Sequence, residues 1–114
     1  MPVTAADQAA DQMKAQRYAM AAALWRQAAV EGGDPELCLG RLAECQYRDG
    51  RLQEALTTCE ELEWRVNDSA NAAFVRGLVL KQQRKSQEAK KSFELAFLRR
   101  HPQAAAQIER LATP

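Results

Sequence analysis

The sequence repeats itself every 34 residues, without a gap, along a chain of 114 residues. Five columns of the aligned copies stay small or apolar in all three copies: Ala9/Ala43/Gly77, Ala21/Ala55/Ala89, Trp25/Cys59/Phe93, Ala28/Leu62/Ala96 and Val30/Trp64/Leu98. A period of about 20–50 residues is typical of stacked supersecondary units, because one unit cannot bury its apolar face alone. The repeat therefore predicts three like units that stack along one axis.

Turn signals divide each unit into two helices. The breaks are Gly32-Gly33-Asp34-Pro35, Asp49-Gly50, Asn67-Asp68-Ser69 and His101-Pro102, and Asp34 is placed to cap the helix that follows it. Between the breaks lie good helix formers, and only five Gly and four Pro argue against an all-β fold. The predicted helices are 3–15, 18–31, 35–48, 52–66, 69–83, 86–100 and 103–112.

Composition argues against several function classes. Sixteen Lys and Arg against fifteen Asp and Glu give a net charge of +1, so the whole-chain charge does not favour nucleic-acid binding. The longest apolar run, 18–25, is far shorter than the roughly 20 residues of a membrane span. No basic, apolar leader is visible at the start of the chain, so we expect a cytoplasmic protein without membrane insertion.

Candidate catalytic and metal-binding groups are few. Cys38, Cys45 and Cys59 match no zinc spacing and fall on positions that the repeat fills with buried residues, so we interpret them as buried thiols. The single histidine, His101, is interpreted as a residue at a helix C-terminus. Because a nucleophilic thiol needs a base beside it, we predict a non-enzymatic protein with no metal and no cofactor.

The second half of each unit resembles the tetratricopeptide repeat (TPR) family. The matching residues are Ala21…Trp25…Ala28, Ala55…Cys59…Leu62 and Ala89…Phe93…Ala96, in repeats spanning 2–35, 36–69 and 70–103. The first half of the motif departs from the family pattern, with Gln46 where a tyrosine is expected. The resemblance implies an all-α, right-handed solenoid of three helical hairpins plus a capping helix over 103–112, forming one domain over 1–114.

The same resemblance implies that a peptide or protein binds in a concave groove lined by the first helix of each hairpin. The groove residues carried over from the family include Met13, Leu37, Arg41, Tyr47, Arg48, Phe74, Val75, Leu78 and Lys81. Of these, Tyr47, Phe74 and Leu78 are the expected anchors. Mostly small or apolar positions with an excess of basic charge suit an apolar or amphipathic segment with some acidic character. In the alternative interpretation, several of these apolar groups pack against the neighbouring hairpin.

Two branches of the family give narrower expectations. One branch binds the acidic C-terminal tails of heat-shock chaperones, and its binding positions fall here on Ala6, Ala10, Arg41, Asn71 and Val75. None of these matches the branch pattern, so we do not expect chaperone tails as partners. The second resemblance is looser. The short length, the three repeats and the Ala/Gln/Arg-rich composition are similar to small bacterial chaperones of type III secretion systems.

Charge and one tryptophan leave further alternatives open. Residues 1–69 hold seven basic and twelve acidic groups, whereas residues 70–114 hold nine basic and three acidic groups. The basic half could bind nucleic acid, although no aromatic platform accompanies it. Trp64 lies off the apolar face of its helix, so it marks either a non-groove interface of a hetero-oligomer or a packing contact between repeats. The oligomeric state stays open.

Overall fold

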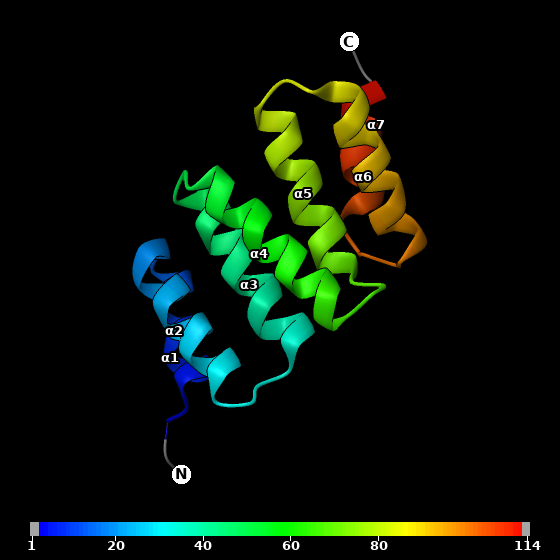
Figure 1. Cartoon of the computed structure of the whole chain (residues 1–114). Coiled ribbons are helices and arrows are strands. Elements are labelled where there is room, and N and C mark those ends of the chain that lie inside the picture. The colour runs from blue at the N-terminus through cyan, green and yellow to red at the C-terminus, as the bar shows by residue number, and fades with distance from the viewer. Residues whose placement is uncertain (1–2, 113–114) are drawn as a thin grey trace.

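The computed structural model describes residues 3–112, and within them the predicted all-α class is confirmed (Figure 1). The ends of the predicted domain, 1–2 and 113–114, and the start of the first predicted repeat at Pro2 lie outside the described residues. The helices are α1 (Ala5–Lys14), α2 (Tyr18–Val30), α3 (Pro35–Arg48), α4 (Leu52–Arg65), α5 (Ala70–Gln82), α6 (Ser86–Leu98) and α7 (Ala104–Ala112). Each predicted helix is present, and its ends lie within two residues of the prediction.

Side-chain caps start the first helix of every hairpin. Thr4 and Asp7 form a reciprocal capping box at α1, in which Thr4 Oγ1 accepts from the Asp7 amide at 3.1 Å. Asp34 accepts from the Leu37 amide at 3.0 Å, which confirms its predicted role as the α3 cap. Ser69 caps α5 in the same way and is fully buried. These caps fix where α1, α3 and α5 begin, the three helices predicted to line the groove.

The turn inside each hairpin is itself repeated. Left-handed φ values of 61°, 81° and 62° occur at Gln16, Gly50 and Arg84, one in each hairpin and 34 residues apart. Only Gly50 adopts this conformation without the steric cost of a Cβ atom. The sequence shows a turn signal only at Gly50, whereas the structure uses the same geometry in all three hairpins.

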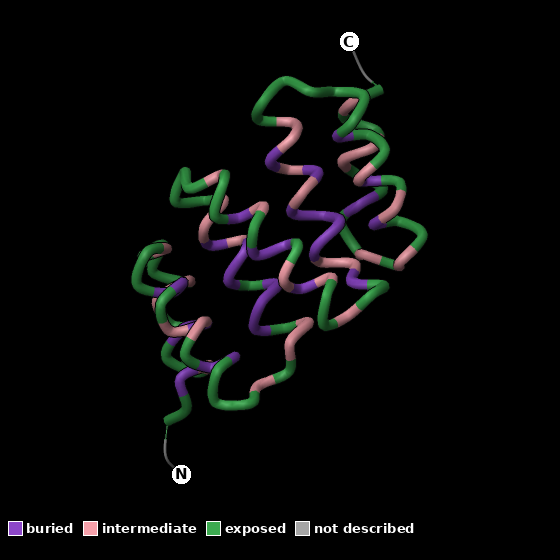
Figure 2. The backbone as a smooth tube through the Cα atoms, viewed as in Figure 1, coloured by how far each residue is buried: buried purple, intermediate pink, exposed green. Residues whose placement is uncertain are grey.

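The small columns of the repeat lie where the two helices of a hairpin touch. Ala21, Ala55 and Ala89 have no exposed surface, and the column of Ala9, Ala43 and Gly77 is buried throughout. Trp25, Cys59 and Phe93 are 4%, 0% and 0% exposed. Figure 2 shows the buried positions along the inward sides of the helices. The repeat register predicted from the sequence is therefore the packing register of the solenoid.

The buried side chains form two clusters that share α5. The first cluster joins α1 to α4 with Ala72, Val75 and Val79 of α5. The second joins Ala73 and Phe74 of α5 with Ala89, Phe93, Ala96 and Ala104. Ile108 and Leu111 of α7 pack against this second cluster, as the prediction of a capping helix requires.

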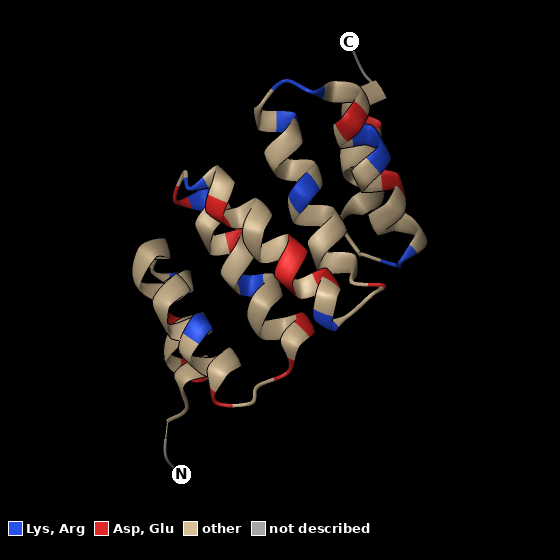
Figure 3. Cartoon of the chain, in the orientation of Figure 1, with Lys and Arg blue, Asp and Glu red and all other residues tan. Residues whose placement is uncertain are grey.

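An ion-pair network joins Glu63 of α4 to Arg76 of α5 and to Arg99, which directly follows α6. Figure 3 shows the basic positions of the chain in blue and the acidic ones in red. The Glu63 carboxylate accepts from Arg76 through Oε1 and from Arg99 through Oε2, the latter at 3.1 Å. Arg99 also donates to the Ser69 carbonyl at 2.9 Å, which ties α6 to the start of α5. All three ionic side chains are largely shielded, with exposed fractions of 25%, 25% and 19% for Glu63, Arg76 and Arg99.

One apolar column of the repeat is exposed. Val30, Trp64 and Leu98, at the ends of α2, α4 and α6, are 78%, 87% and 76% exposed. The interpretation of Trp64 as a packing contact between repeats is therefore wrong, because its ring makes no buried contact. We call these three residues the apolar stripe.

The three cysteines are buried and unpaired, as predicted. Burial raises the pKa of Cys45 and of Cys59 to about 12, so neither carries a thiolate near neutral pH. No helix among the described residues is both long enough and apolar enough to cross a lipid bilayer.

Replacing Ala55 by leucine is expected to lower the free energy of unfolding by about 1–3 kcal/mol, because the larger side chain overpacks a helix contact that has no free space. Ala55 has no exposed surface. Urea unfolding followed by circular dichroism measures the change, and Ala23→Leu, at an exposed position of α2, is the matched control. Equal midpoints for both variants would show that Ala55 does not lie at the contact.

Candidate functional site

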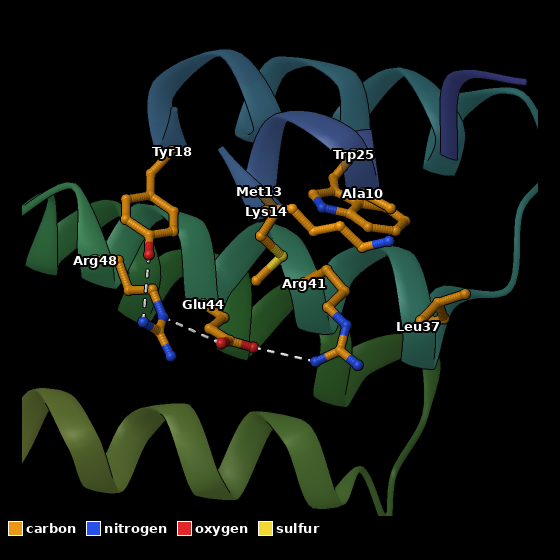
Figure 4. A pocket seen from close by; sticks show the side chains of 9 residues that line it. All are labelled: Ala10, Met13, Lys14, Tyr18, Trp25, Leu37, Arg41, Glu44 and Arg48. Atoms are coloured by element: carbon orange, nitrogen blue, oxygen red, sulfur yellow. Dashed lines mark hydrogen bonds and ion pairs between the residues drawn. The ribbon is translucent and has the colours of Figure 1, made fainter. Parts of the chain in front are cut away.

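A cavity of about 500 Å³ lies between α1, α2 and α3 (Figure 4). Its lining residues are Ala10, Met13, Lys14, Tyr18, Trp25, Leu37, Arg41, Glu44 and Arg48. The four α3 residues among them recur at intervals of three or four positions, so they share one face of that helix. We call this space the apolar cavity, because side chains of low polarity form its base.

Met13, Trp25 and Leu37 are the large aliphatic or indole side chains that line the apolar cavity, and we call them its base. Trp25 is only 4% exposed, and its indole Nε1 has no acceptor among the described residues. Leu37 is 43% exposed although it is a large apolar residue. Figure 4 shows Met13 and Trp25 on the α1–α2 side and Leu37 on the α3 side. A solvent-facing space with such a base is suited to an apolar side chain from outside.

The rim of the cavity is a chain of charged side chains. Glu44 accepts from Arg41 Nη1 through Oε1 and from Arg48 Nε through Oε2, each at 3.2 Å. Arg48 also donates to the Tyr18 hydroxyl at 3.4 Å and lies over the Tyr18 ring. One carboxylate thus serves two guanidinium groups, and Lys14 adds a further positive charge. The rim therefore carries a net charge of +2.

A second, smaller hollow of about 210 Å³ lies on the other side of the same charged side chains. It is lined by Gly40, Arg41, Glu44, Arg48, Asn71, Phe74, Val75, His101, Pro102 and Gln103. The loop between α6 and α7 reaches back to form one of its walls. We call this space the polar hollow.

His101 contributes to that wall, and its amide also closes the end of α6 by donating to the Ala96 carbonyl at 2.9 Å. Helix α6 ends at Leu98, and the His101 ring stacks on Phe74 with ring centroids 3.9 Å apart and planes 8° apart. Burial lowers the pKa of His101, although the charges of Glu44 and Glu36 oppose this. The prediction that His101 lies at a helix C-terminus holds for its backbone, whereas its ring contacts Phe74. No periodic pattern marks a contact between residues 74 and 101, so sequence reasoning missed it.

The close approach of α5 to α3 depends on Gly40. A Cβ atom at Gly40 would lie 2.8 Å from Asn71 Nδ2. Asn71 donates to Glu36 twice, from its amide to Oε1 at 2.9 Å and from Nδ2 to the carbonyl at 3.1 Å. These contacts hold the two helices that flank the polar hollow.

The structure brings together some of the predicted groove residues and separates others. Met13, Leu37, Arg41 and Arg48 line the apolar cavity, and Arg41, Arg48, Phe74 and Val75 line the polar hollow. Tyr47 and Leu78 line neither space, because each packs partly buried against a core cluster. Lys81 also lies elsewhere and donates to Gln107 of α7 at 3.0 Å. Phe74 and Val75 are only 6% and 3% exposed.

Comparison with known proteins supports the fold. No protein-family model matches the sequence, and no curated protein matches it. The Sgt2 TPR domain from Aspergillus fumigatus matches with a TM-score of 0.80 and 16% identity, covering 95% of this chain and 74% of that one. The second TPR domain of human RPAP3, solved in complex with the HSP70 peptide SGPTIEEVD, matches with a TM-score of 0.79 and 19% identity, covering 98% and 95%. The predicted solenoid of helical hairpins is therefore confirmed as a TPR-type fold.

Proposed function

We propose that the chain is a non-catalytic adaptor or chaperone that holds an apolar or amphipathic segment of a partner protein in the concave groove. The apolar cavity between α1, α2 and α3 carries this proposal, because it combines a volume of about 500 Å³ with an apolar base and a basic rim. The fold shared with the two TPR domains, one of them bound to a peptide, supports a protein partner.

The chemistry of the described residues supports a binding role over a catalytic one. Three thiols are buried and two of them have a pKa of about 12, so they are poor nucleophiles. The single imidazole is stacked on Phe74, with burial holding its pKa down. What remains at the groove is apolar surface and guanidinium groups, which recognise apolar side chains and carboxylates.

The proposal predicts that Leu37→Glu weakens capture of groove-binding peptides by about tenfold or more, because an added carboxylate places charge against an apolar ligand side chain. Peptides are first selected against the wild-type chain from a random display library. Fluorescence anisotropy then measures their affinity for each variant. Met20→Glu, at a 52% exposed apolar residue outside the cavity, is the control.

Selected peptides are expected to be apolar with some acidic residues, and equal binding by the wild type and Leu37→Glu would refute the groove. The HSP70 peptide SGPTIEEVD serves as a further probe. We expect it to bind no more tightly than the same peptide with an amidated C-terminus, because Ala6, Ala10 and the nearly buried Val75 occupy positions where the tail-binding branch carries polar or basic groups. Clearly tighter binding of the peptide with the free C-terminal carboxylate would refute that part of the proposal.

A narrower form of the proposal is a small type III secretion chaperone in a bacterial cytoplasm. The three hairpins among the described residues and the apolar groove support it. Secretion genes next to the gene for this chain would strengthen this form, and unrelated neighbours would remove its basis.

A second candidate function is favoured by the apolar stripe of Val30, Trp64 and Leu98. Exposed large apolar side chains at equivalent places in three repeats suit a subunit that uses a non-groove face in a hetero-oligomer. A partner held by this stripe would be lost with Trp64→Ser and retained with Leu37→Glu. Nucleic-acid binding is less favoured, because Arg76 and Arg99 of the basic half are engaged by Glu63.

A further inference from the structure

The polar hollow is lined by hydrogen-bond donors that the protein itself leaves partly unused. Each guanidinium group has five N–H donors. Within the described residues, Arg41 gives one contact to Glu44, and Arg48 contacts Glu44 and Tyr18. Both arginine side chains remain about half exposed, at 47% and 50%. Donors are therefore available to a ligand that enters the hollow.

His101 adds a donor of a different kind. Its Nδ1 accepts from the Gln103 amide at 3.1 Å, so the proton of the neutral ring sits on Nε2. No described residue accepts from that Nε2. The stacking on Phe74 fixes the plane of the ring, so this donor is held in place by the fold. Glu44 is the one acidic residue among those that line the hollow, and its carboxylate is already paired with Arg41 and Arg48.

We infer that the polar hollow receives the carboxylate of an aspartate or glutamate side chain of the same segment whose apolar side chain enters the apolar cavity. The inference rests on the proposed function. Arg41, Glu44 and Arg48 line both spaces, so the two ligand side chains lie on opposite sides of one shared ridge. The polar hollow, with about 210 Å³ against about 500 Å³, is the smaller of the two spaces and has the more polar lining.

A tethered carboxylate is favoured here over a free anion. The ridge arginines are half exposed, so water and salt screen them strongly for an independent ion. A carboxylate attached to an anchored apolar side chain gains a high effective concentration at the hollow. The occupant is therefore part of the bound segment and not an inorganic ion.

The single histidine of the chain gives a direct readout. The charged groups that act on His101 are Glu36, Arg41 and Glu44 of α3, and burial is the main cause of its low pKa. A ligand carboxylate beside the ring stabilises the imidazolium. Occupation of the hollow by an acid therefore raises the pKa of His101, whereas filling the apolar cavity alone does not.

The test uses blocked nine-residue peptides built on alanine, each with one central leucine. One set carries a glutamate one to four positions to either side of the leucine, and a matched set carries glutamine instead. NMR follows the Met13 methyl group for the apolar cavity and titrates His101 for the hollow. Sodium acetate at the same concentration is the free-anion arm.

We expect at least one glutamate peptide to bind about tenfold more tightly than its glutamine partner and to raise the pKa of His101. Arg41→Gln should remove this difference while the Met13 methyl still responds to both peptides. Arg51→Gln, at an exposed arginine that pairs with Asp49 and Glu54 away from the hollow, should leave it intact. Acetate alone should not shift the His101 titration.

The possible failures are distinguishable. Equal binding by glutamate and glutamine peptides, with an unchanged His101 titration, overturns the inference and leaves the proposed function standing. A His101 shift with acetate alone overturns the tethered carboxylate. Peptides that leave the Met13 methyl unperturbed overturn the groove and the inference together.

Discussion

Phe93→Ala is expected to lower the free energy of unfolding by about 3–5 kcal/mol, as for other large aromatic side chains removed from a core. The Phe93 side chain has no exposed surface and is central to the second core cluster. Its ring centroid lies 5.5 Å from that of Phe74, with the ring planes tilted by 56°. Urea unfolding followed by circular dichroism measures the loss.

Gly77 gives this prediction an internal control, because a Cβ atom there would lie 2.6 Å from Phe93 Cε1. In the wild-type background, Gly77→Ala should lower the free energy of unfolding by about 1–3 kcal/mol, although alanine is the better helix former. In the Phe93→Ala background the same substitution should raise it, since the ring is gone. A stabilising effect in both backgrounds would mean that the ring does not press on Gly77.

Glu63→Ala is expected to cost about 2–3 kcal/mol at neutral pH, because it leaves two shielded arginines without their carboxylate. Arg76 and Arg99 are only 25% and 19% exposed, so water replaces the lost contacts poorly. The matched control is Glu60→Ala on the same helix, for which the structure shows no ion pair. If both variants lose the same free energy of unfolding, the ion-pair network does not contribute to stability.

The contribution of Glu63 also depends on pH. Partial burial acts to raise the pKa of Glu63, but hydrogen bonds from Arg76 and Arg99 outweigh it, so the pKa lies below the ordinary value of 4.5. A group whose pKa is lower in the folded state contributes stability above its unfolded pKa and loses it as the pH falls. The stability difference between the wild type and Glu63→Gln should therefore be constant near neutral pH and shrink below pH 4.5. A difference that does not change in acid would contradict this assignment.

The helices and their packing register could be predicted from the sequence because both follow local, repeated patterns. Columns such as Ala21/Ala55/Ala89 report a contact that recurs in every hairpin, and the same contact appears in the structure at each copy.

The groove could be predicted only in part, because position within a repeat does not determine whether a side chain stays free. Tyr47 and Leu78 lie on first helices, as the family pattern requires, yet each packs against a core cluster. The place of His101 in the lining of the polar hollow could not be predicted for a different reason. Its contact with Phe74 joins a loop to a helix 27 residues earlier, outside the period that carries the rest of the signal.

The division of the core into two clusters affects what a melting curve reports. In cooperative, all-or-none unfolding every part of a domain unfolds together. Stacked repeats can depart from this behaviour, because each repeat contacts only its neighbours. Trp25 lies on α2 and Trp64 on α4, whereas the second cluster is built from α5, α6 and α7. Tryptophan emission therefore follows the first half of the array, while the far-ultraviolet signal averages over all helices. A single transition temperature describes the molecule only where these two observables coincide.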